Sequence, residues 1–263
     1  MKKFQILKHS NIKDLDYYWF KYLFHDIFLI SLQRTTRTTM KNFNKIKEIK
    51  LILIDCDGVL YHPSELDVNA IIYAFDNVCD KSNMKSYKFS NIDYHNLKDK
   101  PVKTFFNYMN YTAKKHGIKT EDFILNVIKH IDYSRIKPDK DNILQKLIKL
   151  SQKYKICICS NNHKAHINNI LKAKFNINAE QFPFDIFDIN FAFQNDIFYD
   201  KHSDVFIKKL EQHFDLKARD FLWIDDTQPI LETLTNFGCQ TILVTQENHL
   251  SDIINNMYIN TTI

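Results

Sequence analysis

Leu51-Ile-Leu-Ile-Asp-Cys-Asp-Gly-Val-Leu-Tyr61 is the stretch of this sequence that decides its fold. Its four leading apolar residues lie in a run, Lys50–Asp55, that predicts a strand buried on both faces, as in a parallel sheet. The chain then becomes polar at Asp55 and Asp57, and Gly58 allows a sharp turn. In open α/β sheets, ligands bind outside the carboxyl ends of such strands. The stretch therefore predicts the first core strand and one wall of a site.

Three further apolar runs have the character of buried strands. They span Lys155–Ser160, Asp220–Asp225 and Gln240–Thr245, and a weaker candidate spans Phe187–Phe193. Apolar residues at helical spacing lie between them, around 143–150, 167–171 and 205–210. Strand and helix in alternation predict an α/β fold, a doubly wound parallel sheet with a Rossmann-like core.

One long segment, 64–136, interrupts this alternation. It shows helical patterns at Ile71–Val78, Val102–His116 and Thr120–His130, and it contains no convincing strand. Thr120 with Asp122 resembles a helix start. Because the segment enters directly after the first core strand, we predict that 64–136 is a helical cap and that 49–63 and 137–263 form the core.

The first 48 residues read as an N-terminal extension of uncertain order. The stretch 17–30 is aromatic and apolar, but charged residues interrupt it, so no membrane span is expected. It also lacks the clean apolar core and cleavage site of a signal peptide. Met40 begins a plausible shorter protein, and the sequence leaves open whether it is the true start.

Composition is that of an ordinary globular protein. Hydrophobic residues make up 44% and charged residues 25% of the 263, and the net charge of +5 is spread along the chain. No basic block indicates a nucleic-acid polymer as partner. The five cysteines show no zinc spacing, which favours buried free thiols and a cytoplasmic location. The oligomeric state is not indicated.

Polar residues end three of the predicted strands. Asp55 ends the first, Ser160 and Asn161 end another, and Asp225 and Asp226 end a third. Any one of these alone is commonly a helix cap. Because the carboxyl ends of parallel strands share one edge of a sheet, the joint pattern predicts an active site there.

These residue types suit phosphoryl transfer. Asp55 can attack phosphorus and form an aspartyl-phosphate, while Asp57 can protonate the leaving oxygen and later deprotonate water. Several converging carboxylates need a cation, and hard oxygen ligands beside a phosphate suit Mg²⁺. We assign the metal site to Asp55, Asp57, Asp225 and Asp226, with Asp226 favoured over Asp225 as a direct ligand.

The transferring phosphoryl group also needs donors for its oxygens. Ser160 offers a hydroxyl, and the backbone amide of Asn161 lies where a helix begins. Lys201, which precedes an amphipathic helix, is the favoured cation, with Lys164 and Lys172 as less well placed alternatives.

The motifs in this order resemble the haloacid dehalogenase superfamily of hydrolases. The matching pieces are Asp-Cys-Asp-Gly-Val-Leu-Tyr at 55–61, Cys-Ser-Asn-Asn at 159–162, Lys201, and Trp-Ile-Asp-Asp-Thr at 223–227. The resemblance covers about 49–247. It implies that Asp55 is the nucleophile, Asp57 the acid/base, Ser160 and Lys201 the phosphate ligands, and Asp225 and Asp226 the Mg²⁺ ligands. It also implies a Rossmann-like core with a cap inserted after the first motif.

Within the superfamily, an acid at position 57 distinguishes phosphatases from the members that cleave carbon–halogen bonds. Tyr61 and the segment 132–138, Asp-Tyr-Ser-Arg-Ile-Lys-Pro, resemble the pyrimidine 5′-nucleotidase-like branch, which implies nucleoside monophosphates as substrates. Three positions depart from the family pattern. They are His202 in place of the usual Pro, Ile230 in place of the usual Asn, and Leu234 in place of a small residue.

We therefore predict a magnesium-dependent phosphatase that hydrolyses a small phosphomonoester through an aspartyl-phosphate. Two alternatives remain open from the sequence. A phosphomutase would share every core residue, and a catalytically silent module would use the same cleft for recognition only. The specific substrate is not indicated.

Overall fold

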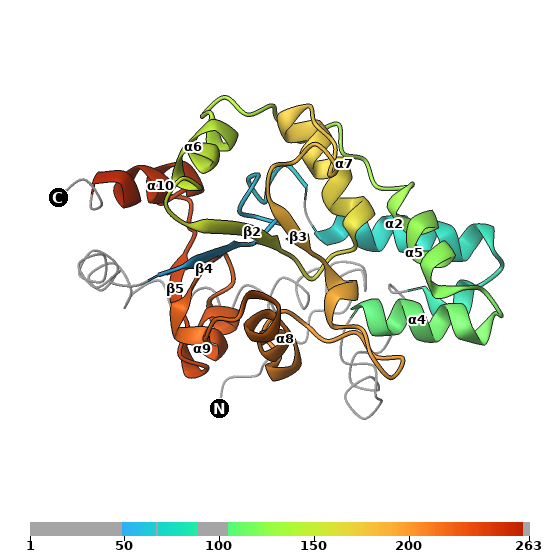
Figure 1. The fold of residues 1–263 in the computed structure, drawn as a ribbon. Helices are drawn as coiled ribbons and strands as arrows, with labels where there is room; N and C mark the ends of the chain where they lie inside the picture. Colours follow the sequence, from blue (N-terminus) through green and yellow to red (C-terminus); the bar gives the residue numbers. More distant parts are fainter. Residues whose placement is uncertain (1–48, 67, 89–104, 260–263) are drawn as a thin grey trace, which may run out of the picture. The chain divides into compact units, whose positions relative to one another are not determined.

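The computed structural model describes residues 49–66, 68–88 and 105–259, all of which belong to one compact unit, 43–263. Its centre is a five-stranded parallel sheet in the order β3-β2-β1-β4-β5 (Figure 1). The strands are β1 (Leu51–Ile54), β2 (Lys155–Cys159), β3 (Asp185–Phe187), β4 (Phe221–Asp225) and β5 (Gln240–Leu243). The predicted doubly wound parallel sheet is confirmed.

Helices cover both faces of the sheet. In Figure 1, α6, α7 and α10 lie on one side and α8 and α9 on the other. The bounds of these helices are α6 (Ile143–Leu150), α7 (Lys164–Phe175), α8 (Asp204–Phe214), α9 (Gln228–Asn236) and α10 (Leu250–Ile259). The described part of the chain also holds three short 3₁₀ helices, η2 (Lys85–Tyr87), η4 (Ile189–Ala192) and η5 (Ala218–Asp220).

Alternate residues of the central strands supply the core beneath α8 and α9. Leu51 and Leu53 of β1 lie in one apolar cluster with Cys157 and Cys159 of β2 and with Trp223 of β4, and all five are fully buried. Residues two apart on a strand share a face, so Cys157 and Cys159 point the same way. All five cysteines of the chain are free and buried.

The strand predicted at Phe187–Phe193 is wrong. β3 ends at Phe187, and the chain continues as the 3₁₀ helix η4. The Asp188 carboxylate accepts a hydrogen bond from the backbone N–H of Asn190 at 3.1 Å, and it therefore caps the turn. A short acidic side chain that captures a nearby backbone donor competes with the sheet ladder, which explains the early end of the strand.

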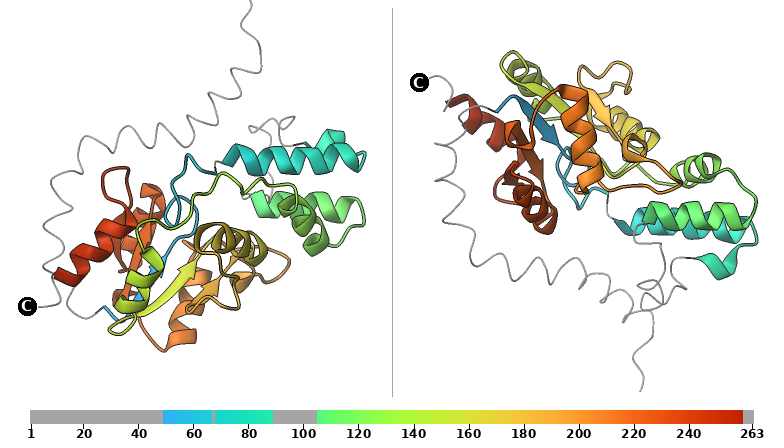
Figure 2. Two further views of the ribbon diagram at one scale, coloured as in Figure 1. Left: turned by 90° about the horizontal axis from the view of Figure 1, so that it is seen from above. Right: turned by 60° about the horizontal axis from the view of Figure 1, so that its bottom comes forward.

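Between β1 and β2, the described residues of 64–136 form helices joined by turns and loops, and no strand. The helices are α2 (Val68–Lys81), α4 (Phe105–Lys115) and α5 (Thr120–Ile128), together with η2. α5 packs on both α2 and α4, and Figure 2 shows the three side by side. α5 begins at Thr120 as predicted, but the Thr120 hydroxyl donates to Asn110 Oδ1 at 2.7 Å and does not cap the helix.

Two sets of hydrogen bonds tie this helical segment to the core. The backbone N–H of Lys137 donates to Glu65 Oε2 at 2.9 Å, which joins the two ends of the segment. The buried Asn107 side chain of α4 accepts from the backbone N–H of Phe198 at 3.0 Å and donates to its carbonyl at 3.2 Å. The exact limits of the cap stay a prediction.

Some predictions lie outside the described residues. They concern the extension at 1–48, the start at Met40 and the first residues of the pattern Val102–His116. Among the residues that the structure describes, no helix is both long and apolar enough to cross a membrane.

Candidate active site

The carboxyl ends of three adjacent strands carry the predicted residues. β1 lies between β2 and β4, and Ile54 pairs with Ile158 on one side and Ile224 on the other. The residues that follow these strands are therefore neighbours: Asp55 after β1, Ser160 after β2, and Asp225 at the end of β4. The site that the joint strand-end pattern predicts is assembled by this strand order.

Lys201 links two of these strand ends. Its Nζ lies 2.6 Å from Asp55 Oδ1 and 2.7 Å from Asp225 Oδ2, and the side chain is almost fully buried. Burial lowers the pKa of Lys201, but Asp225 and Asp55 outweigh it and hold the pKa above its ordinary value. The side chain is thus a cation at neutral pH, and removing it would leave two buried carboxylates uncompensated.

The loop bearing Lys201 is itself held in place. The backbone N–H of Lys201 donates to Asn161 Oδ1 at 2.7 Å, just after β2. Asn161 was predicted to bind phosphate through its backbone amide, and its side chain has this second task of fixing the lysine. Of the two alternative cations, Lys172 lies on α7 beside a separate pocket, and Lys164 is exposed at the start of the same helix.

Asp55, Asp225 and Asp226 form a group that can hold a metal ion. One carboxylate oxygen from each lies within 4.8 Å of the others. Burial raises the pKa of Asp55 well above its usual range, Lys201 opposes this, and Asp225 and Asp226 raise it further. Three carboxylates share one ammonium, so a divalent cation is needed to balance the charge. An all-oxygen donor set of this kind fits Mg²⁺.

Thr227 orients the two acidic residues at the end of β4. Its backbone N–H donates to Asp225 Oδ1 at 2.9 Å, and its hydroxyl donates to Asp226 Oδ1 at 3.1 Å. Ile230 stands where the family usually has Asn, and its side chain packs on the apolar cluster beneath α8 and α9. Thr227 therefore makes the polar contacts to the two carboxylates that an Asn side chain at position 230 would otherwise be expected to make.

Gly58 allows Asp226 to approach the first motif. Its φ of +74° is a left-handed conformation, and a Cβ added there would lie 2.0 Å from Asp226 Oδ2. Any side chain at this position would collide with a carboxylate of the metal group. The glycine thus serves both the sharp turn predicted from the sequence and the close packing of β1 and β4 ends.

Asp57 lies apart from that metal group and is held by four donors. Oδ1 accepts from the Tyr61 hydroxyl at 2.5 Å and lies 3.0 Å from His166 Nε2. Oδ2 accepts from Asn162 Nδ2 at 2.6 Å and from the Ser160 hydroxyl at 3.4 Å. Burial alone would raise the pKa of Asp57, but His166 and these hydrogen bonds lower it below its usual range. Its side-chain contacts do not place Asp57 among the metal ligands, and that assignment stays a prediction.

Ser160 connects Asp57 to the second strand. It is almost fully buried, and its Oγ accepts from the backbone N–H of Asn162 at 3.0 Å. Its hydroxyl hydrogen is directed to Asp57 over a long 3.4 Å contact, so a phosphate oxygen can compete for it.

Five functional contacts escaped the sequence predictions: those of Tyr61, Tyr133, Asn162, His166 and Thr227. His166 had a detectable signal, because it is a polar residue on the apolar face of a helix beside Ile167 and Ile170. The others lie in turns, where spacing predicts no direction for a side chain. His202 stands where the family usually has Pro. Its buried Nδ1 has no hydrogen-bond partner among the described residues.

Replacing Gly58 tests the close packing of the metal group. We expect Gly58→Ala to abolish the stabilisation of the protein by Mg²⁺, because the added Cβ displaces Asp226. Gly117→Ala is a matched control, since Gly117 also has a positive φ (+65°) but nothing within 4 Å of an added Cβ. Thermal unfolding with and without Mg²⁺ measures the effect, and an unchanged Mg²⁺ response in Gly58→Ala would contradict it.

Mg²⁺ binding should depend on pH through Asp226. Burial, helped by Asp225 and opposed by Lys201, raises the pKa of Asp226 to about 6. As pH falls through this value, the metal-free folded protein takes up a proton that the unfolded chain, with a pKa of about 3.9, does not. The metal-free protein therefore gains stability from this group on acidification, while Mg²⁺ must displace the proton.

We accordingly expect the apparent Mg²⁺ affinity to fall by up to about tenfold per pH unit below about pH 6. Titration calorimetry across this range measures it. Asp226→Asn should remove both the binding and its pH dependence, whereas exposed Asp196→Asn should change neither. A Mg²⁺ affinity that stays constant down to about pH 5 would be inconsistent with a titrating ligand.

Comparison with known proteins agrees with this geometry. A profile of the haloacid dehalogenase-like hydrolase family matches residues 49–238. No curated protein matches the chain. Among solved structures, a haloacid dehalogenase family enzyme of Bacteroides thetaiotaomicron, in complex with magnesium and inorganic phosphate, is 17% identical with a TM-score of 0.46, over 75% of this chain and 94% of that one.

A mutant of CbbY from Rhodobacter sphaeroides, in complex with xylulose-(1,5)bisphosphate, is 12% identical with a TM-score of 0.50, over 77% of this chain and 90% of that one. At such identity the likeness concerns the fold alone. The family profile spans well over half of the chain, across all the motifs described above. Mg²⁺ is the cofactor of this family, and the three-carboxylate group fits it. The chain is an enzyme that belongs to the haloacid dehalogenase-like hydrolase family.

Proposed function

We propose that the protein is a magnesium-dependent phosphatase that hydrolyses a small phosphomonoester through a phosphorylated Asp55. One observation carries the proposal: two carboxylates two residues apart have separate surroundings. Asp55 is 8% exposed and faces Lys201 and the metal group, whereas Asp57 is 28% exposed and faces neutral donors and His166. Pairs of carboxylates in different environments are how one site carries both a nucleophile and an acid/base.

In the first half of the reaction, an oxygen of Asp55 forms a bond to phosphorus while the bond to the leaving alkoxide breaks. Lys201 Nζ lies 2.6 Å from Oδ1 of this carboxylate, where its positive charge favours the ionised form and holds the carboxylate in position. His166 and the hydrogen bonds keep Asp57 ionised in the free protein, but the negative charge of a bound phosphate raises the pKa of Asp57 and favours its protonated form. The protonated Asp57 gives its proton to the departing oxygen, so that the alcohol leaves neutral. The product of this half is an aspartyl-phosphate at Asp55.

In the second half, Asp57 is ionised and takes a proton from water. The water oxygen forms a bond to phosphorus, the bond to the Asp55 oxygen breaks, and inorganic phosphate leaves. Ser160 and the backbone amide after it donate to the phosphoryl oxygens in both halves. Mg²⁺, held by Asp55 and Asp226 with Asp225 beside them, would neutralise phosphate charge.

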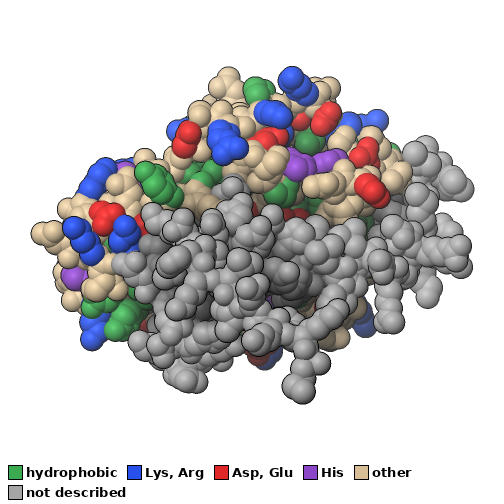
Figure 3. Space-filling view, turned by 180° about the vertical axis from the view of Figure 1, so that it is seen from behind, with side chains coloured by type: hydrophobic (Ala, Val, Ile, Leu, Met, Phe, Trp, Pro, Cys, Tyr) green, Lys and Arg blue, Asp and Glu red, His purple; other side chains and the backbone are tan. Residues whose placement is uncertain are grey.

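Within the class of small phosphomonoesters, we propose nucleoside monophosphates as the substrates. Support comes from Tyr61 and the segment 132–138, which carry that resemblance. Basic and acidic side chains are interspersed on the described surface in Figure 3, which supports a small substrate over a nucleic-acid polymer. The five free, buried cysteines support a cytoplasmic location.

Substitution of the two carboxylates tests the chemistry. With p-nitrophenyl phosphate and Mg²⁺, we expect Asp55→Asn to lower kcat by roughly 10³-fold or more, because no nucleophile remains. Asp57→Asn should lower kcat by roughly 10²-fold or more, the usual scale for loss of an acid/base. Asp196→Asn is the exposed control. Wild-type turnover in Asp55→Asn would exclude the covalent route, and EDTA-resistant turnover would exclude the metal.

A panel of phosphomonoesters tests the substrate. We expect UMP and CMP to give higher kcat/KM than hexose phosphates, with release of inorganic phosphate. A preference for a non-nucleotide ester would overturn the nucleotide assignment and leave the phosphatase intact. Conversion of a hexose phosphate to its isomer, without phosphate release, would indicate the phosphomutase instead.

A further inference from the structure

We propose that His166, backed by Tyr133, is a positioning residue that fixes the acid/base Asp57 so that one chosen oxygen of the carboxylate transfers the proton. The inference rests on the proposed function, because it assigns a task to a group that contacts the acid/base. Neither residue was among the site residues predicted from the sequence.

His166 lies inside α7, on the face that packs against the sheet. It is 1% exposed and is flanked by Ile167 and Ile170, which are fully buried. A polar ring in such surroundings costs free energy unless its nitrogens have partners. Nε2 has one in Asp57 Oδ1 at 3.0 Å, a contact that joins α7 to the turn after β1.

Tyr133 supplies the partner of the other ring nitrogen. Its hydroxyl lies 2.7 Å from His166 Nδ1. Burial raises the pKa of Tyr133, so the hydroxyl keeps its hydrogen and can donate it to Nδ1. Nε2 then carries the ring hydrogen and donates to Asp57. With both nitrogens engaged, rotation of the imidazole ring would break two hydrogen bonds.

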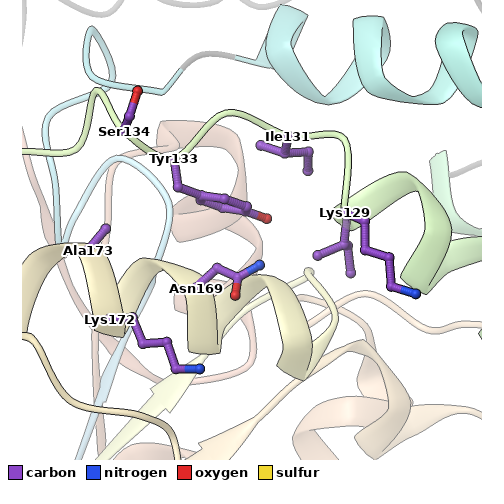
Figure 4. A pocket seen from close by; sticks show the side chains of 8 residues that line it. Lys129, Ile131, Tyr133, Ser134, Asn169, Lys172 and Ala173 are labelled. Carbon is purple, nitrogen blue, oxygen red and sulfur yellow. The ribbon is translucent and has the colours of Figure 1, made fainter.

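Tyr133 approaches from the segment that links α5 to α6. It lines an open pocket of about 460 Å³, together with Lys129 on one side and Asn169 and Lys172 of α7 on the other (Figure 4). The chain of contacts therefore runs from this pocket wall through one buried ring to the acid/base.

The four donors to Asp57 divide its two oxygens into different tasks. Oδ1 is held by the Tyr61 hydroxyl at 2.5 Å and by His166 Nε2 at 3.0 Å. Oδ2 contacts Ser160 and Asn162, which follow β2, where the phosphoryl group is expected. When a phosphate oxygen takes the hydroxyl of Ser160, Oδ2 loses its weakest donor. Oδ1 is thus the anchored oxygen, and Oδ2 is the one that carries the proton.

The competing explanation is that His166 is a core histidine whose bond to Asp57 serves stability alone. The leaving group separates the two. An alkoxide departs poorly without a proton, whereas p-nitrophenolate departs readily without one. Misplacing the acid must therefore slow an alkyl phosphate more than p-nitrophenyl phosphate, while a general loss of folded protein slows both equally.

The experiment compares His166→Leu with His163→Leu. His163 is a matched control, because it lies one turn earlier at the start of α7, is 5% exposed and also contacts a carboxylate, with Nε2 2.9 Å from Glu121 Oε1. We expect His166→Leu to lower kcat for ethyl phosphate by about 10- to 100-fold, and for p-nitrophenyl phosphate by only a few-fold. His163→Leu should change both by the same factor.

Two further variants keep the test valid if His166→Leu folds poorly. His166→Gln places an amide donor near the position of Nε2 and should restore most of the activity on ethyl phosphate. Tyr133→Phe, which removes only the hydroxyl, should show the same dependence on the leaving group in weaker form. Tyr258→Phe, which removes a hydroxyl bonded to the carbonyl of Lys146 far along the chain, is its control.

Equal losses on both substrates in His166→Leu and Tyr133→Phe would overturn the positioning role and leave a structural one. In the background of Asp57→Asn, His166→Leu should add no further leaving-group-dependent loss, and an added loss would also overturn the proposal. Failure of the wild-type enzyme to hydrolyse either ester is a different outcome, which would refute the phosphatase itself.

Discussion

The site depends on one buried cation held between two buried carboxylates. Lys201 can be taken out of water only because Asp55 and Asp225 both lie within ion-pair distance of its ammonium group. Asp55 follows β1 and Asp225 ends β4, whereas the lysine comes from a loop, so the position of this loop must be fixed for both ion pairs to form. Asn161 fixes it from the core side, and Asn107 of α4 holds the backbone of Phe198 three residues earlier. The helical segment therefore contributes to a site whose reacting groups are all in the core.

The same charge balance explains why the two motif carboxylates differ. Around Asp55 the acidic groups outnumber the single lysine, and the remaining negative charge favours a divalent cation. Around Asp57 the compensation comes instead from hydrogen-bond donors and a histidine, which leave no such deficit. Two residues of sequence therefore separate a site for a metal ion from a site for a proton. Cys56 between them is fully buried.

Much of this arrangement was predictable from local sequence. Four consecutive apolar residues before Asp55 indicate a buried strand, and the order of the motifs indicates which strand ends meet. The contacts of Tyr61, Asn162 and Tyr133 were not predictable in the same way, because these residues lie outside helices and strands, where spacing predicts no direction for a side chain. The strand expected over Phe187–Phe193 failed for a related reason. Its apolar residues fit a strand, but Asp188 captured a backbone donor and turned the chain.

The nucleophile and the acid/base that we propose, Asp55 and Asp57, are thus supported by different parts of the protein. Asp55 is fixed by Lys201 and Asp225, both in the core. Asp57 is fixed partly through Tyr133, at the junction of the helical segment and the core, by way of His166. Phosphate is common to every phosphomonoester, whereas the leaving group differs between substrates and is met by the acid/base. It follows that the residues around Tyr133 can differ between enzymes that act on different substrates. The ion pairs around Asp55 must be kept, because every phosphoryl transfer at this site depends on them.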